Sequence, residues 1–298
     1  TDLGVMNLVV DSASIQVDRR ARRAKSDRLD LKQLMGMLRR HHGGEQGVWS
    51  VVKVPSVEAE DERQPQRHLA SLKQQATRIS NRITGLLALE GVTATVNAGL
   101  VDRLDQLTRP DGRPLGRHMR DRLADDLEQW QLIQNQIKRW EARRRERLAE
   151  RHEREDAIAE QVARLMQLRG IGEHSAWLFV TEIFSWREIE NRRQLGALCG
   201  LTPTPYDSGN CSREQGISRA GNARVRWMAN QIAWSWLRNQ PDSKLTRWFH
   251  RRFDHGKRQR KRGVTALSRR LLISLWRYLQ TGELPPGARL KAEAGAGT

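Results

Sequence analysis

Apolar residues recur at alternating steps of three and four along one stretch of this 298-residue chain. That spacing places them on one seam of a long helix, which is stable in water only when a second apolar surface covers the seam. A second long helical pattern follows after a loop marked by glycine and proline, so the two helices could form an antiparallel hairpin. The first seam contains Leu69, Leu72, Ala76, Ile79, Ile83 and Leu86, and the second contains Leu123, Leu127, Trp130, Ile133, Ile137 and Trp140.

The first seam also predicts a coiled coil, through which we expect copies of the chain to form a homo-oligomer. The second helix ends in residues 141–156 (EARRRERLAERHERED), where charged side chains leave little apolar surface. Two interpretations of this run stay open, a solvated helix and a contact with nucleic acid.

Basic residues dominate the charge of the chain. Lysine and arginine number 53 against 35 acidic residues, which gives a formal net charge of +18 and a pI near 11.1. An excess of this size favours a polyanionic partner, and nucleic acid fits better than a membrane because no run approaches the roughly 18 apolar residues of a spanning helix. Only Cys199 and Cys211 occur, without zinc-site or disulfide-rich spacing, so we expect a reducing cytoplasm.

The first residues predict a strand and then a helix. Residues 3–10 (LGVMNLVV) are typical of a buried strand rather than of a signal peptide. Because the chain starts at Thr1 instead of Met, we expect that N-terminal sequence is missing. A helix should open at Ser26, a plausible N-cap, with Leu29, Leu31, Leu34, Met35 and Leu38 on its apolar side.

Two aspartates follow this N-cap. Asp27 and Asp30 are three residues apart, so their carboxylates share one face of the helix. With further acidic groups they would suit Mg²⁺ in phosphoryl transfer. Acidic residues in a first turn also complement the helix dipole, and this simpler role stays open.

A helical hairpin with a Gly-x-Gly turn is predicted over residues 165–176 (LMQLRGIGEHSA), in the form of a helix-hairpin-helix. Gly170 and Gly172 would let the turn approach a phosphate, and the amides of the next helix could bind it without reading bases. A plain helical hairpin is the alternative.

Small, flexible and basic residues are concentrated in residues 201–226. This stretch lacks the apolar content of a core, whereas its arginines and its Gly-Asn step could hold successive phosphates. Ser208 precedes a glycine in a proline-bracketed loop, where its hydroxyl could be presented free of a regular ladder, although most serines in such settings are turn residues. The candidate phosphate-binding residues are Arg213, Arg219, Gly221, Asn222, Arg224 and Arg226.

Further along, an amphipathic helix carries Val225, Met228, Ile232 and Trp236, and a basic cluster at residues 255–262 (HGKRQRKR) precedes a last helix with Leu267, Leu271, Leu275 and Leu279 on one face. The chain is therefore predicted to be mainly α. We expect residues 285–298 to form a disordered tail.

The order of these elements resembles that of transposases of the insertion sequence 110 family, serine-dependent recombinases with a DEDD-type RuvC-like domain that use a bridging RNA. Residues 23–34 (RAKSDRLDLKQL) look like the end of the RuvC-like domain, and the seam from Leu69 looks like the family's coiled-coil linker. The resemblance implies an incomplete α/β, RNase H-like remnant in residues 1–50, a helical linker in 51–155 and an α-rich transposase domain in 156–284.

The same resemblance implies functions for particular residues. Asp27 and Asp30 correspond to the last two acidic residues of the RuvC-like domain, which implies Mg²⁺ as cofactor. Ser208-Gly209 upstream of residues 221–226 (GNARVR) matches the family's nucleophile motif, with Ser212 as a weaker rival. The implied partners are donor and target DNA and a structured guide RNA.

One departure concerns the first two acidic residues of the family, because neither Asp2 nor Asp11 lies in the expected strand and turn context. Two other functions stay open, a nucleic-acid-binding protein without catalysis and a truncated, inactive transposase.

Overall fold

The computed structural model describes residues 4–15, 26–208, 211–253 and 256–291. The chain divides into two compact units, Thr1–Glu58 and Ala59–Thr298. The predicted mainly α fold is confirmed, because helices dominate both units and the described part of the chain has a single sheet of two strands. The predicted helical linker, from residue 59 onward, lies in the same unit as the predicted transposase domain.

The first unit contains the 3-10 turn η1 (Ser12–Ser14) and helix α1 (Asp27–His42), whose predicted N-cap is confirmed because the Ser26 hydroxyl accepts from the Leu29 amide. The predicted buried strand in residues 3–10 is wrong for the part described. Val10 forms an isolated antiparallel bridge with Val51, the Val9 carbonyl accepts from the Val52 amide, and the side chain of Met6 is 77% exposed. The described residues of this unit form no strand next to this apolar run, so it has no sheet on which to bury its side chains.

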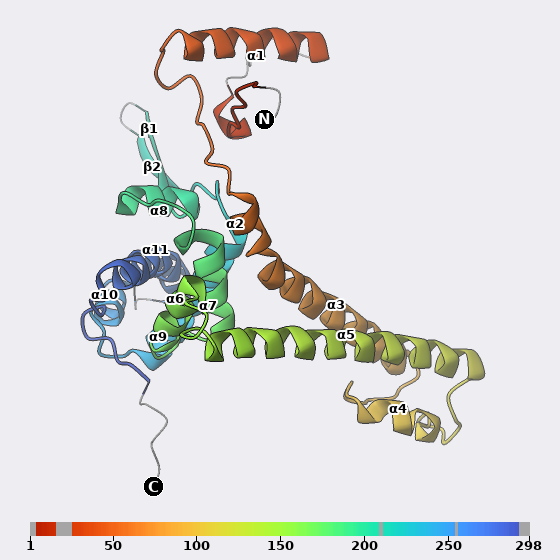
Figure 1. Ribbon diagram of the computed structural model, residues 1–298. Coiled ribbons are helices and arrows are strands. Elements are labelled where there is room, and N and C mark those ends of the chain that lie inside the picture. The colour runs from red at the N-terminus through yellow and green to blue at the C-terminus, as the bar shows by residue number, and fades with distance from the viewer. Residues whose placement is uncertain (1–3, 16–25, 209–210, 254–255, 292–298) are drawn as a thin grey trace. The chain divides into compact units, whose positions relative to one another are not determined.

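The second unit begins with α2 (Val57–Asp61), which crosses the boundary, and continues into the long helices α3 (Gln64–Leu89) and α5 (Arg117–Ala149). Figure 1 shows these two helices lying side by side, and they are joined through α4 (Gly99–Arg103) and η2 (Leu104–Gln106). All six residues of the first predicted seam are buried, and they pack with Leu123, Leu127, Ile133 and Ile137 of α5. The predicted hairpin is confirmed, so the seam is covered within one chain, and a homo-oligomer stays a prediction that this seam no longer supports.

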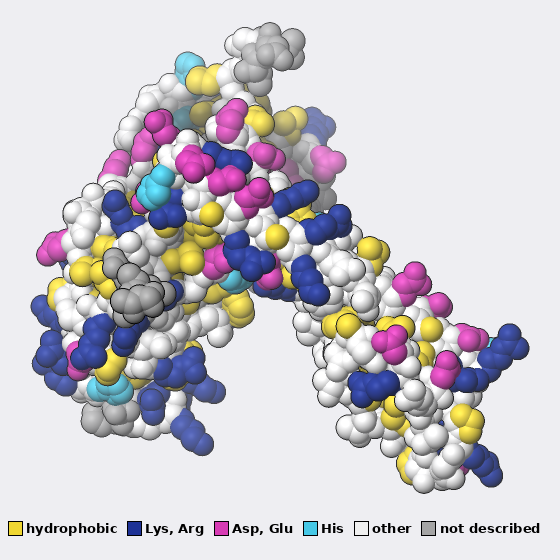
Figure 2. Space-filling model, turned by 60° about the horizontal axis from the view of Figure 1, so that its bottom comes forward, with side chains coloured by type: hydrophobic (Ala, Val, Ile, Leu, Met, Phe, Trp, Pro, Cys, Tyr) yellow, Lys and Arg dark blue, Asp and Glu magenta, His cyan; other side chains and the backbone are white. Residues whose placement is uncertain are grey.

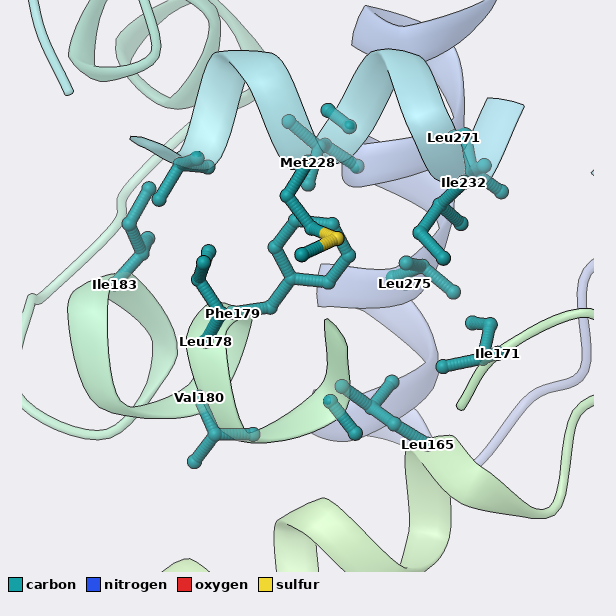
Figure 3. Packing of buried hydrophobic residues seen from close by; sticks show 14 of the residues in the cluster. Leu165, Ile171, Leu178, Phe179, Val180, Ile183, Met228, Ile232, Leu271 and Leu275 are labelled. Atoms are coloured by element: carbon teal, nitrogen blue, oxygen red, sulfur yellow. The ribbon is translucent and has the colours of Figure 1, made fainter. Parts of the chain in front are cut away.

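The remaining helices form a second core. They are α6 (Ala157–Met166), α7 (Glu173–Phe179), the π-helical turn η3 (Val180–Phe184), α8 (Arg192–Leu198), α9 (Ala223–Asn239), α10 (Lys244–Phe253) and α11 (Lys257–Thr281). Figure 3 shows Leu165, Phe179, Met228 and Leu275, from four of these helices, converging on one apolar centre. The apolar positions predicted on α9 are all buried. None of the helices described is both long and apolar enough to cross a membrane.

The predicted disorder after Pro285 is wrong for residues 285–291. Leu290 forms a backbone bridge with Leu168, and the Lys291 amide donates to the Gln167 carbonyl at 2.7 Å. Gln240, which is fully buried, donates through its side-chain amide to the Arg289 carbonyl at 2.8 Å and accepts from the Arg289 amide at 2.7 Å. Pro285 is buried and Ala288 packs against the second core, so apolar contacts and these hydrogen bonds together hold the segment, which composition alone does not reveal.

A buried carboxylate connects the start of the α3–α5 hairpin to the second core. Glu182, in η3, has a side chain that is 1% exposed. It accepts hydrogen bonds from Arg63 Nη2 at 2.9 Å and from Arg67 Nε at 3.0 Å. Glu60 pairs with the same two arginines at 2.6 and 2.5 Å. Cations at the N-terminus of a helix such as α3 oppose its dipole, so the two carboxylates offset an otherwise unfavourable placement.

Glu182 stays ionised in this environment. Burial on its own would raise the pKa of the carboxyl group, but the hydrogen bonds and charges of Arg67 and Arg63 outweigh burial and lower the pKa to about 2, from an ordinary value of 4.5. Because the pKa is depressed in the folded state, the stabilisation is fully present above about pH 4.5 and is lost as the pH falls toward 2.

We expect Glu182→Gln to lower the free energy of unfolding at pH 7 by about 3 kcal/mol, the lower end of the range for breaking a buried ion pair, because both arginines keep Glu60. The difference from the wild type should shrink as the pH is lowered from 5 to 2.5, since wild-type Glu182 then takes up a proton. Urea denaturation at several pH values measures both effects.

Glu190→Gln is the matched control, because Glu190 is an exposed carboxylate only eight residues further along the chain. It should change the unfolding free energy by less than about 0.5 kcal/mol at any pH. If the Glu182→Gln deficit stayed constant down to pH 2.5, the ion pair would not be its cause.

Candidate nucleic-acid interface

Ser208 lies at the end of a β-hairpin and not in an irregular loop. Strand β1 (Pro203–Ser208) pairs antiparallel with β2 (Cys211–Ile217), and Ser208 is opposite Cys211. The predicted loop is therefore wrong, since Ser208 belongs to a regular ladder. A two-residue Gly-Asn connection between short polar strands is a hairpin signal, and it could have been recognised in residues 203–217. The side chains of residues 206–214, including Ser208, Ser212 and Arg213, lie outside the described part of the structure.

Two glycine segments cross at the base of this hairpin. Gly221 has a φ of +118°, and a Cβ at this position would lie 2.4 Å from the Leu198 carbonyl oxygen. Gly200 has a φ of +64° and would meet the Ala220 carbonyl oxygen at the same distance. Because neither position can accommodate a side chain, the predicted Gly-Asn step packs the start of α9 against the end of α8.

Asn222, predicted to contact phosphate, makes its side-chain hydrogen bonds within the protein. Its Oδ1 atom caps α9 by accepting from the amides of Arg224 and Val225, and its Nδ2 atom donates to Glu182 at 2.9 Å. Arg226 donates to the Cys199 carbonyl at 3.2 Å. Arg224 approaches Glu182 at 3.6 Å, yet 55% of its side chain is exposed. Of these three residues, Arg224 has the most exposed side chain.

The remaining predicted residues lie in two different places. Arg219 is exposed near the base of the β-hairpin, where its amide donates to the Gly200 carbonyl at 3.1 Å. Gly170 lies at the other end of α9, because its carbonyl accepts from the Ser235 hydroxyl at 2.9 Å. The 17 residues of α9 span roughly 25 Å, so the structure does not bring the two predicted groups together.

The turn between α6 and α7 has a helix before it and a helix after it, as predicted. The Gly172 amide donates to the Ser175 hydroxyl at 3.2 Å, and Glu173 supplies a negative charge in the first turn of α7. The bonded Gly172 amide and the negative charge of Glu173 both lie at the N-terminus of α7, where the sequence predicted that backbone amides bind an anion. The contact of Gly170 and Gly172 with nucleic acid stays a prediction.

Asp27 and Asp30 are exposed in the first turn of α1, as expected from the Ser26 N-cap. Across the described ranges, no group of three or more His, Cys, Asp or Glu side chains could hold a metal ion. Mg²⁺ is often held by one or two carboxylates together with substrate phosphates and water, so these two residues fit part of such a shell.

Cys199 provides no alternative nucleophile. Burial raises the pKa of its thiol to about 12, so the group is protonated at neutral pH.

A basic surface on α10 and α11 was not among the predicted site residues. Neither α10 nor residues 257–263 contain an acidic residue, and Figure 2 shows Lys and Arg side chains gathered at one end of the lobe formed by the second core. We call the exposed residues of this region the α10–α11 basic surface. They are Lys244, Arg247, Arg251, Arg252, Lys257, Arg258, Lys261 and Arg262.

Close packing of the two helices concentrates this charge. Gly263 allows it, because a Cβ there would lie 2.5 Å from the ring of Phe253. Arg270 stacks on Trp248 at 3.9 Å, and its pKa is lowered by burial and then by repulsion from Arg252. Arg251, Arg252 and Arg258 have no carboxylate partner among the residues described. The surface is therefore an uncompensated positive patch, suited to a polyanion. The run at residues 255–262 was the available sequence signal.

Comparison with known proteins agrees with these features. Residues 162–246 match the sequence model described as "Transposase IS116/IS110/IS902 family". The "Putative transposase y4rJ" of Sinorhizobium fredii is 38% identical over 296 residues, which cover 97% of this chain and 74% of that protein. The "Probable family 20 transposase" of Pseudomonas aeruginosa is 28% identical over 59% of this chain and 50% of its own length. The "Transposase for insertion sequence element IS1328" of Yersinia enterocolitica is 33% identical over 30% of this chain and 25% of its own length. Because the match to the Sinorhizobium fredii relative covers nearly all of this chain and 74% of that protein, the chain belongs to the IS116/IS110/IS902 family of transposases.

Proposed function

We propose that this protein is a recombinase that cuts and rejoins DNA during insertion-sequence transposition. The observation that carries the proposal is the α10–α11 basic surface, whose arginines have no carboxylate partner among the described residues and lie in the same compact unit as the Ser208 hairpin. Such a surface binds the phosphate backbone without reading sequence.

Ser208 is the proposed nucleophile. Attack of its Oγ atom on a DNA phosphodiester forms a P–Oγ bond, breaks one P–O bond to deoxyribose and releases a deoxyribose hydroxyl, while the serine proton passes to a base. A hydroxyl of another DNA end then displaces the serine. Each step exchanges one phosphodiester for another, so rejoining needs no outside energy source. Nearby arginines would stabilise the charge that develops at phosphorus.

Asp27 and Asp30 are the proposed Mg²⁺ ligands, and the ion would supply charge neutralisation at a phosphate. A structured guide RNA as a second nucleic-acid partner, and a homo-oligomeric assembly, are the remaining parts of the proposal. The net charge of +18 suits binding of more than one nucleic acid.

Ser208→Ala should abolish the covalent protein–DNA adduct, by at least about a hundredfold, because no other atom replaces the nucleophile. The measurement uses end-labelled duplex DNA, with the adduct resolved on a denaturing gel. Duplex affinity should stay within about twofold, since the hydroxyl adds no charge.

Ser212→Ala is the matched control, because it removes the rival hydroxyl from the opposite strand of the same hairpin. It should keep the adduct. If Ser212→Ala abolished the adduct and Ser208→Ala kept it, Ser212 would be the nucleophile. If the wild type bound the duplex but formed no adduct, the non-catalytic alternative would be favoured.

Asp27→Asn and Asp30→Asn should each weaken Mg²⁺-dependent adduct formation by about tenfold or more, while circular dichroism shows an unchanged helix content. If the two aspartates only complement the dipole of α1, each substitution would cost about 0.3–1 kcal/mol of stability and leave the Mg²⁺ titration unmoved. Asp125→Asn, at an exposed position of α5, provides the comparison.

Replacing Arg251, Arg252 and Arg258 together by Gln should flatten the dependence of duplex affinity on salt. Each lost phosphate contact lowers the slope of log affinity against log salt by about 0.9, so a decrease of 2 to 3 is expected, on the order of three lost contacts. Fluorescence anisotropy at several salt concentrations measures the slope.

The charge-matched control replaces Arg78, Arg122 and Arg139, which are exposed on the α3–α5 hairpin. It should leave the slope nearly unchanged. Equal slopes for the two triple variants would exclude the α10–α11 basic surface as the principal contact.

A further inference from the structure

A cavity of about 180 Å³ lies where the α3–α5 hairpin meets α7. It contains none of the predicted site residues, but three of its arginines belong to the charged run 141–156, for which the sequence left a contact with nucleic acid open. Tryptophans and arginines make up much of its lining. The lining residues that matter here are Gln66, Trp140, Arg143, Arg144, Arg147 and Trp177.

Three buried polar atoms of the lining residues have no hydrogen-bond partner in the described part of the chain. One is Nε of Arg144, which lies 3.4 Å from a Glu173 carboxylate oxygen. The other two are Oε1 of Gln66 and Nε1 of Trp177, on residues that are each only 4% exposed. The amide nitrogen of Gln66 is fixed by His174, since it lies 3.0 Å from Nδ1 and 3.5 Å from the carbonyl oxygen. The wall of the cavity therefore contains a buried acceptor and a buried donor, both covered by neighbouring atoms, an arrangement that is costly unless something pairs with both atoms.

Cations and aromatic rings alternate around this space. Arg144 and Arg147 lie over the ring of Trp177 at 5.4 and 5.2 Å, and Arg143 lies over Trp140 at 5.1 Å. Arg147 pairs with Glu62 and Asp156, and Arg144 approaches Glu173 at 3.4 Å. Arg143 is exposed and has no carboxylate partner among the described residues. The rim of the cavity thus keeps one uncompensated positive charge next to an aromatic face.

We propose that this cavity binds one unpaired nucleobase of a nucleic-acid strand, with a neighbouring phosphate on Arg143. Trp140 and Trp177 provide aromatic surface. A shift of the lining side chains that uncovers the two buried atoms would let Gln66 Oε1 accept from the base edge and Trp177 Nε1 donate to it. Cavities of roughly 150 Å³ accommodate one benzene ring, so 180 Å³ suits the single ring of a pyrimidine. A base in a duplex is stacked and cannot enter, so the ligand is single-stranded or extruded.

This inference rests on the proposed nucleic-acid function but concerns a different part of the surface. The α10–α11 basic surface would hold backbone phosphates of any sequence, whereas the cavity would distinguish a strand that carries bases from one that lacks them. The unpaired strand could be DNA opened during strand exchange or RNA, because both offer the same pyrimidine edge.

The test compares the affinity of the full chain for an oligothymidylate with its affinity for an oligonucleotide of equal length and charge made of abasic units. The wild type should prefer thymidine by about tenfold, within the range for stacking of one base on aromatic side chains. Trp140→Leu and Gln66→Leu should each reduce this preference to less than about twofold. Trp234→Leu, which removes a 37% exposed tryptophan outside the cavity, should keep it.

Charge variants test the phosphate contact. Arg143→Gln should weaken oligothymidylate binding by about fivefold, while Arg145→Gln, which removes the same charge from an exposed position two residues along α5, should change it less than twofold. The affinity for an oligouridylate is measured in parallel. If it exceeds the affinity for the oligothymidylate, the strand is RNA, and if it is lower, the strand is DNA.

Photocrosslinking tests the proposal on the wild-type protein, without any substitution that could affect folding. A strand carrying 5-iodouracil should crosslink to peptides that contain Trp140 or Trp177. If thymidine and abasic strands bind equally while duplex binding stays salt-dependent, the cavity proposal is overturned and the nucleic-acid function stands. If the chain binds no nucleic acid, both fail.

Discussion

The carboxylate of Glu182 is the point at which the two halves of the larger unit are held together. It is buried, ionised and bonded to Arg63 and Arg67 at the start of α3, and Asn222 donates to it from the cap of α9. The hairpin, the second core and the base of the β-hairpin therefore share one anion. A π-helical turn carries it, and such turns occur often at functional sites because they displace one side chain from the regular helix pattern.

The sequence predicted that residues 201–226 carry both the nucleophile and the phosphate-binding residues, whereas the structure favours two different surfaces for these roles. The Gly-Asn step and Arg226 act within the protein, where they fix the junction of α8, β1 and α9. A cluster of arginines without a carboxylate partner among the described residues lies instead on α10 and α11. The proposed chemistry thus rests on a short hairpin with a rigid base, and the proposed grip on the phosphate backbone rests on another face, so either can change without loss of the other.

Periodic patterns predicted the fold well where local spacing decides the outcome. The seam from Leu69 and the apolar faces of α9 and α11 could be predicted because the apolar positions of a packed helix repeat every three to four residues. The N-cap at Ser26 could be predicted because capping depends only on residues next to each other in the chain. The strand prediction was wrong for residues 4–10 because a strand needs neighbouring strands, which the pattern of one segment does not supply.

Long-range polar contacts were beyond the reach of the sequence. Glu182 is one acidic residue among 35, and nothing in its neighbours shows that Arg63, 119 residues earlier, is its partner. The cavity between the hairpin and α7 likewise depends on the meeting of Gln66 and Trp177, which are far apart in the chain. Of the candidate site, the basic run at residues 255–262 was visible, whereas the internal roles of Asn222 and Arg226 required the assembled structure.

The segment 285–291 has a consequence for how the protein matures on the ribosome. The turn after α6 receives its last backbone and side-chain partners from Arg289 and Lys291, and the Ile171 carbonyl is bonded to a lysine 120 residues later. Domains generally fold as units during synthesis, beginning from the N-terminal side. The α3–α5 hairpin can assemble early from its own residues, but the lobe beside it stays unfinished until translation has passed Lys291, so a newly made chain cannot complete that lobe before then.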